Sequence, residues 1–284
     1  MQIVKSVAEM QSLCRQLRTK GVLLGFVPTM GALHEGHLSL IRRARAECEV
    51  VVASIFVNPL QFAPGEDLSR YPRPFEEDCG ALVAERVDLL FAPETGEMYP
   101  NGSKTTVTVS QVGDRLDGAS RPGHFTGVAT VVAKLFHVVG PTRAYFGQKD
   151  AAQLAVLRQM ARDLNFDVEV IECPIVRDTD GLALSSRNRY LNAIERERAL
   201  VLRRALLRME QMIAEGERQS TTLIQNGMKV LSAATQIRVD YLAIVDANTL
   251  LPVTSVETGT LIAVAAYVGN TRLIDNFLVA SVQT

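Results

Sequence analysis

The chain has 284 residues, of which 47% are hydrophobic and 21% are charged, so it holds enough apolar material for one large domain or two moderate ones. Its formal net charge of −1 lacks the basic excess that binds nucleic acid through phosphates, and we expect no nucleic-acid partner. It has no signal-peptide pattern and no run of about 18 apolar residues, so we expect a cytoplasmic protein with no membrane partner.

The first part of the chain alternates short apolar runs with segments of helical period. Residues 151–164, for example, repeat apolar side chains along one helical face. The pattern predicts strands at 22–27, 49–57, 87–93, 142–147 and 166–176, and helices after Gly36 and over 151–164. Such an alternation of strand and helix is typical of a parallel sheet covered by helices, so the expected fold class is α/β.

The rhythm of the sequence changes near residue 176. A polar, glycine-containing segment follows, and then two helical patterns and two strand patterns, at about 193–214, 219–235, 238–246 and 260–268. We therefore predict a domain over residues 1–176 and a smaller α+β domain over residues 177–284.

Four cysteines are scattered through the chain without CxxC spacing, at Cys14, Cys48, Cys79 and Cys173. Neither a zinc knuckle nor a redox pair is indicated. We expect reduced and mostly buried thiols, with Cys173 in the core.

The stretch FVPTMGALHEGH, residues 26–37, predicts a strand, a turn and the start of a helix. A helix N-terminus offers N–H groups and positive dipole to an anion such as phosphate. The pattern is neither GxGxxG nor GxxxxGK[ST]; instead His34 and His37 flank Gly36 as HxGH. From the residues alone, an ordinary helix start with two exposed histidines remains open. A zinc site is also conceivable, although HExxH spacing and an evident third ligand are missing.

Five segments that follow one another along the chain closely resemble motifs of one family. They read PTMGALHEGH, SIFVNPLQF, GASRPGHFTGVATVV, YFGQKDAAQL and LALSSRN. They resemble the pantoate–β-alanine ligase (pantothenate synthetase) family of the HxGH nucleotidyltransferase superfamily, and the likeness runs from about residue 3 to the end. The resemblance implies a Rossmann-like parallel-sheet domain, a C-terminal domain that acts as a lid over the active site, and a homodimer.

The resemblance also implies an activity. The family condenses (R)-pantoate with β-alanine at the expense of ATP, forming (R)-pantothenate, AMP and pyrophosphate through a pantoyl adenylate, in the biosynthesis of a coenzyme A precursor. Adenylation gives the carboxylate a leaving group that an amine can displace. Because the first step gathers negative charges, catalysis would depend on positioning and charge neutralisation.

The family pattern assigns site residues. Catalytic roles fall on His34, His37, Lys149 and Arg187, with His37 as proton donor. The residues implied in ATP binding are Met30, Gly31, Ala32, Leu33, His34, Glu35, Gly36, His37, Gly147, Gln148, Lys149, Asp150, Val176, Leu184, Ser185, Ser186 and Arg187. Gln61 and Gln153 would bind pantoate, and Gln61 would also border the β-alanine position.

Without the family, several of these residues have plainer interpretations. Lys149 and Asp150 could be a surface pair at a strand end, and residues 181–191 could be a polar linker. Gln61 would be a loop residue and Gln153 a solvent-facing helix residue.

Magnesium is expected on the β- and γ-phosphates of ATP, because this cation prefers substrate oxygens and water. Glu77 and Asp78 are candidate ligands, but acids at a helix start also compensate the helix dipole, so the metal ligands stay unassigned. Arg121 and His124 are expected in a basic loop near the phosphates.

Two other functions share the HxGH motif. A cytidylyltransferase-like enzyme would form no amide, and the GQKD and LSSRN segments disfavour it. A nucleotide sensor would bind ATP without turnover. AMP formation that requires both pantoate and β-alanine would distinguish the ligase from both.

Overall fold

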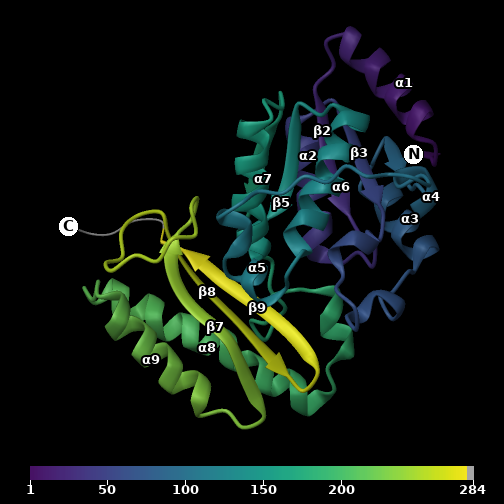
Figure 1. The fold of residues 1–284 in the computed structure, drawn as a ribbon. Helices are drawn as coiled ribbons and strands as arrows, with labels where there is room; N and C mark the ends of the chain where they lie inside the picture. Colours follow the sequence, from purple (N-terminus) through teal and green to yellow (C-terminus); the bar gives the residue numbers. More distant parts are fainter. Residues whose placement is uncertain (280–284) are drawn as a thin grey trace. The chain divides into compact units, whose positions relative to one another are not determined.

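The computed structural model describes residues 1–279, which divide into two compact units (Figure 1). The first unit comprises Met1–Gly147 and Val156–Pro174. The second comprises Gln148–Ala155 and the chain from Ile175 on. The short segment Gln148–Ala155 therefore packs with the second unit, although both of its neighbours along the chain belong to the first.

The first unit contains a six-stranded sheet in which every pairing is parallel. In chain order its strands are β1 (Gln2–Val4), β2 (Leu24–Thr29), β3 (Val50–Ile55), β4 (Leu89–Phe91), β5 (Arg143–Gly147) and β6 (Glu169–Cys173). The predicted Rossmann-like α/β class is confirmed, and five of the strands lie where apolar runs predicted them. The sequence did not predict β1, which has only three residues.

Helices flank this sheet (Figure 1). Their bounds are α1 (Val7–Thr19), α2 (Glu35–Glu47), α3 (Phe75–Ala84), α4 (Thr95–Met98), α5 (Asp117–Ser120), α6 (His124–Val139) and α7 (Ala151–Asp163). The side chains of α6 are buried almost all around the helix. Sequence reasoning missed this helix, although its less buried residues Thr126, Lys134 and His137 recur at helical spacing.

The order of the strands reverses direction between β2 and β5. The order is β1-β4-β3-β2-β5-β6, so the chain runs outward from β2 through β3 to β4 and then resumes on the other side at β5. In open parallel sheets, ligands bind at such a reversal, beyond the carboxyl ends of the strands. Here those ends are Thr29 of β2 and Gly147 of β5.

The second unit packs two helices, α8 (Ala193–Ala214) and α9 (Ser220–Ser232), against a three-stranded sheet (Figure 1). The sheet is antiparallel in the order β7 (Ile237–Asp246), β8 (Thr260–Val268) and β9 (Thr271–Leu278). The α+β class of this part is confirmed. Strand β9, which the sequence did not predict, follows β8 through the two-residue Gly-Asn loop typical of a hairpin.

All four cysteines are free thiols; Cys14, Cys48 and Cys173 are buried and Cys79 is half-buried, as predicted. Within residues 1–279, no helix is both long and apolar enough to cross a membrane.

Candidate functional site

The hydroxyl of Thr29, the last residue of β2, makes two hydrogen bonds that fix the turn after this strand. The Thr29 hydroxyl donates to the carbonyl of Ser54 (2.7 Å) and accepts the N–H of Gly31 (3.1 Å). Gly31 has a φ of +79°, and a Cβ there would lie 2.9 Å from Oδ2 of Asp78. Only glycine fits this turn without strain, because the backbone is left-handed and the space is occupied.

Asp78 on α3 fixes the same turn through two further hydrogen bonds. Its carboxylate, 3% exposed, accepts the N–H of Ala32 at Oδ2 (2.8 Å) and that of Leu33 at Oδ1 (2.7 Å). The sequence offered Asp78 as a metal ligand or as compensation for the helix dipole. In the structure both carboxylate oxygens fix the backbone of the predicted ATP-binding turn.

We expect Asp78→Asn to lower the free energy of unfolding by about 1–3 kcal/mol, because the amide nitrogen would face a backbone N–H and leave it unpaired while buried. Urea unfolding followed by circular dichroism measures the loss. Glu77→Gln, at the exposed neighbouring position, is the matched control and should change little. Equal stabilities for the two variants would contradict the role given to Asp78.

The two histidines cap α2. His34 is the N-cap residue, and its Nδ1 accepts the N–H of Gly36 (3.1 Å). The Nδ1 of His37 accepts the N–H of His34 (3.3 Å), and the ring centroids are 4.1 Å apart. Because each Nδ1 accepts, each neutral imidazole carries its hydrogen on Nε2. The capping box therefore turns both histidines into Nε2–H donors, the form that can donate to an anion.

Gln61 lies at the end of a short 3-10 turn, Pro59–Gln61, after β3. Its Nε2 is 2.8 Å from Sδ of Met30, and its Oε1 accepts from Nδ2 of Asn58 (3.1 Å). The fold thus brings the predicted pantoate residue to the predicted ATP turn. Sequence reasoning missed Asn58, although an asparagine directly before a proline is typical of an N-cap.

The backbone of Gln61 is fixed by α6. Nδ1–H of His124 donates to the Gln61 carbonyl (2.8 Å), and Nε2 of His124 accepts from Arg121 (2.9 Å), which also pairs with Glu66 (2.7 Å). Gly127 allows the close approach, since a Cβ there would lie 2.2 Å from the carbonyl oxygen of Leu60. Arg121 and His124, expected near phosphates, hold the backbone of Gln61, the predicted pantoate residue.

Burial and the neighbouring Arg121 lower the pKa of His124 to about 4, from an ordinary value of 6.5. Between pH 6.5 and 4 the unfolded chain binds a proton at this histidine and the folded protein does not. Lowering the pH through this window should therefore reduce the free energy of unfolding, by on the order of 3 kcal/mol.

Urea unfolding at a series of pH values tests this loss of stability. His124→Asn keeps a donor for the Gln61 carbonyl but cannot titrate, so its stability should vary less across the window. Parallel pH profiles for the two proteins would show that His124 does not carry the effect.

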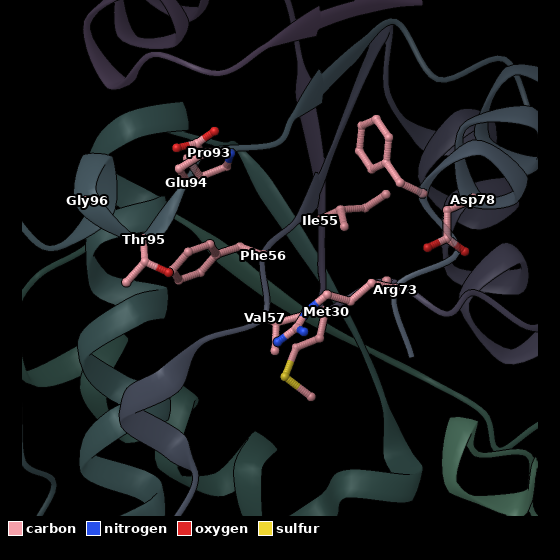
Figure 2. A pocket seen from close by; sticks show the side chains of 12 residues that line it. Met30, Ile55, Phe56, Val57, Arg73, Asp78, Pro93, Glu94, Thr95 and Gly96 are labelled. Atoms are coloured by element: carbon pink, nitrogen blue, oxygen red, sulfur yellow. The ribbon is translucent and has the colours of Figure 1, made fainter. Parts of the chain in front are cut away.

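A cavity of about 590 Å³ lies at the carboxyl ends of β2, β3 and β4 (Figure 2). Met30 and Gly31 line it after β2, Ile55–Val57 at the end of β3, and Pro93–Gly96 after β4. Figure 2 also shows the guanidinium of Arg73, which lines the cavity, near Met30 and Val57. Its volume suits a small organic molecule, and its walls are mostly apolar.

The remaining predicted site residues belong to the second unit, except Gly147, which ends β5. In the second unit Asn276 on β9 holds the turn of Gln148 and Lys149. Its Nδ2 donates to the carbonyls of Gln148 (3.0 Å) and Lys149 (2.9 Å), and its Oδ1 accepts from Nε2 of Gln148 (3.2 Å). Lys149 lies 3.8 Å from Asp150, and Gln153 is half-buried on α7.

Asp275, next to Asn276, anchors the loop of residues 177–187, in which Leu184–Arg187 are predicted to bind the phosphates of ATP and which is called the predicted phosphate loop below. Its carboxylate, 4% exposed, pairs with both Nη atoms of Arg177 (2.7 and 2.9 Å), and Arg177 donates to the carbonyl of Gly181 (3.2 Å). Sequence reasoning missed both β9 residues. Both residues lie in the segment LIDN, residues 273–276, for which the sequence suggested no role.

Hydrogen bonds between residues close in sequence order the predicted phosphate loop itself. The N–H of Leu184 donates to the carbonyl of Val176 (3.0 Å), and the Ser185 hydroxyl accepts the N–H of Arg187 (3.3 Å). Ser186 is buried. In the first unit Glu35, another predicted ATP residue, pairs with Arg42 on the same helix.

Among residues 1–279 no group of three or more His, Cys, Asp or Glu side chains is placed to hold a metal ion. A resident metal cage is therefore not formed by these side chains, and an ion carried in on substrate oxygens would need no such cage.

Comparisons with known proteins show which family this chain is similar to. The sequence profile of the pantoate-beta-alanine ligase family matches residues 2–278. A pantothenate synthetase of Acidobacterium capsulatum is 58% identical, with 98% of this chain and 97% of the relative covered. The crystal structure of pantothenate synthetase from Thermus thermophilus superposes with a TM-score of 0.92 at 50% identity, covering 99% of this chain and 100% of that one.

A pantoate-beta-alanine ligase from Francisella tularensis, solved in complex with beta-gamma ATP and beta-alanine, superposes with a TM-score of 0.76. It is 33% identical, with 98% of this chain and 97% of that chain covered.

Proposed function

Since the chain belongs to the pantoate–β-alanine ligase family, we propose how its own residues carry out the family's reaction. The protein is an ATP-dependent ligase that condenses (R)-pantoate with β-alanine to form (R)-pantothenate, AMP and pyrophosphate. The observation that carries the proposed mechanism is the histidine cap of α2, where both imidazoles are Nε2–H donors at the carboxyl edge of the sheet.

In the first step the pantoate carboxylate attacks the α-phosphorus of ATP, forming pantoyl adenylate and releasing pyrophosphate. His34 and His37 donate hydrogen bonds from Nε2–H to phosphate oxygens, and the hydrogen bond from His37 stabilises the charge on the departing pyrophosphate. Lys149 and Arg187 neutralise the charge that accumulates on the phosphates. These donors stabilise the transition state because negative charge shifts to the leaving group there.

The other ATP contacts are proposed from the family pattern. The turn Met30–Leu33 lies along the nucleotide, and Gly147 and Asp150 hold the ribose. The Val176 backbone contacts adenine, and Leu184–Arg187 close over the phosphates. Residues 177–284 would act as the lid that carries this loop.

The acid substrate is proposed to bind to the side-chain amides of Gln61 and Gln153. Amides can donate to a carboxylate or accept from a hydroxyl without adding a charge that would repel ATP. In the second step the β-alanine amine, next to Gln61 and in its neutral form, attacks the acyl carbon of the adenylate. The C–N bond forms, the acyl C–O bond to AMP breaks, and the proton lost from nitrogen passes to water or to a phosphate oxygen.

Magnesium is proposed to arrive on the β- and γ-phosphates with its remaining sites filled by water, and it would supply further neutralisation of charge. Both oxygens of Asp78 already accept backbone N–H groups, so this residue is suited to holding the turn. The protein ligands of the ion remain unassigned.

We further propose a cytoplasmic homodimer. The segment 103–110, with the β-prone sequence SKTTVTVS, lies outside the strands of both described sheets and is mostly exposed, so it is accessible to pairing with a second copy. Sedimentation velocity measures the mass directly.

AMP formation as a function of both substrates tests the proposal. AMP should accumulate only when pantoate and β-alanine are both present in excess over enzyme. With pantoate alone, one equivalent of pyrophosphate per active site should be released as the adenylate forms. ATP binding without turnover would instead indicate a sensor.

A further inference from the structure

Asn58 connects Gln61 to the rest of the first unit. Its side chain is 1% exposed and makes four hydrogen bonds. Oδ1 accepts the N–H of Leu60 (3.3 Å) and the hydroxyl of Tyr99 (2.8 Å), while Nδ2 donates to the carbonyl of Gly127 (3.0 Å) and to Oε1 of Gln61 (3.1 Å). All the hydrogen-bonding capacity expected of a buried amide is used.

Two of these partners are backbone groups that cannot reverse their roles. The N–H of Leu60 only donates and the carbonyl of Gly127 only accepts, so together they fix which end of the Asn58 amide is oxygen. Tyr99 must then donate to Oδ1. The atom of Gln61 that meets Nδ2 must be its oxygen, so the Gln61 NH₂ group is at the other end, toward Met30.

The Tyr99 hydroxyl is suited to donating a hydrogen bond to Oδ1 of Asn58. Tyr99 follows α4, and its ring lies 6.1 Å from that of Phe56 and 5.7 Å from Nζ of Lys134, so the ring is held by contacts that do not involve the hydroxyl. Burial raises the pKa of Tyr99, so the hydroxyl keeps its proton and remains a donor.

We propose that Tyr99 is a positioning residue which, through Asn58, holds Gln61 with its NH₂ group presented to the acid substrate. This inference rests on the proposed role of Gln61 in binding pantoate. The substrate carboxylate is an acceptor only, so an NH₂ group attracts it and an amide oxygen in the same place would repel it. The hydrogen bonds that link Tyr99 through Asn58 to Gln61 are called the relay below. The relay thus favours binding of the ionised acid, which is the form that attacks ATP.

A double-mutant cycle with Tyr99→Phe and Gln61→Ala tests the relay, with initial rates of AMP formation giving KM for each substrate. Tyr99→Phe should raise KM for pantoate about threefold to tenfold, the effect of losing one hydrogen bond, and leave KM for ATP within about twofold. In the Gln61→Ala background the same change should have no further effect. Tyr267→Phe, whose ring stacks on Arg238 in the second unit, is the matched control.

Each other outcome has a distinct meaning. If Tyr99→Phe raises KM equally with and without Gln61, or does not raise it at all, Tyr99 does not act through Gln61 and the relay is overturned. If Gln61→Ala itself leaves KM for pantoate unchanged, the proposed function of Gln61 fails, and the relay with it.

Gln61→Glu tests the orientation without touching Tyr99. The variant keeps an acceptor for Asn58 but replaces the NH₂ group with an oxygen. KM for pantoate should rise at least as much as in Gln61→Ala, because two carboxylates would then meet. A KM near that of the wild type would overturn the donor assignment.

Discussion

His37→Asn is expected to lower kcat about 100-fold or more while leaving the thermal unfolding midpoint nearly unchanged. Oδ1 of asparagine can take the place of Nδ1, so the hydrogen bond from the N–H of His34 and the cap of α2 would persist. What the variant loses is the Nε2–H donor. Steady-state AMP formation at saturating ATP, pantoate and β-alanine measures kcat, and differential scanning calorimetry measures the midpoint.

His37→Gln provides the complementary case. Glutamine can place an N–H group near the position of Nε2 but does not reproduce the acceptor at Nδ1, so it should retain more activity and lose up to about 1 kcal/mol of stability. His137→Ala, at an exposed position late in α6, should change neither quantity. If His37→Asn turned over at a nearly normal rate, the phosphate role of His37 would be wrong.

Asp275→Asn is expected to destabilise the second unit by about 3 kcal/mol or more, because it leaves the Arg177 guanidinium without its buried counter-charge. The phosphate loop should loosen as well, since Arg177 also holds the carbonyl of Gly181. Hydrogen exchange of the β8 and β9 amides measures the local stability, and initial rates measure KM for ATP, which should rise.

Asp240→Asn separates the two effects. Asp240 forms a comparable ion pair with Arg272 (2.7 Å) on the same sheet, with both side chains less than one-fifth exposed. It should reduce stability and leave KM for ATP unchanged. Equal rises in KM for the two variants would mean that general loosening of the unit, and not the link to the loop, is responsible.

Sequence reasoning succeeded where the information is local. Buried parallel strands are short apolar runs, so five of the six were visible, and HxGH gave the histidine pair because its members are three residues apart. It failed for α6, whose many β-branched residues favour a strand, although the polar residues Thr126, Thr130, Lys134 and His137 recur at helical spacing.

The residues that shape the site were harder to predict than those expected to touch the substrates. Asp78 reaches a turn 45 residues earlier, and Asn276 reaches Gln148 across 128 residues. Spacing along the chain does not encode such contacts, which depend on how strands and helices pack. The tautomers of His34 and His37 likewise follow from backbone N–H groups whose direction only the fold determines.

The long sequence separation between Asn276 and the turn of Lys149 affects the order in which parts of the protein fold during synthesis. The turn that carries Lys149 is made early, but its anchor is 127 residues further on. At about 5–20 residues per second, a ribosome needs roughly 6–25 s to cover that interval. A nascent chain can thus complete its first sheet and the α2 cap well before this lysine turn is secured, so the proposed contribution of Lys149 to catalysis begins only after β9 has emerged.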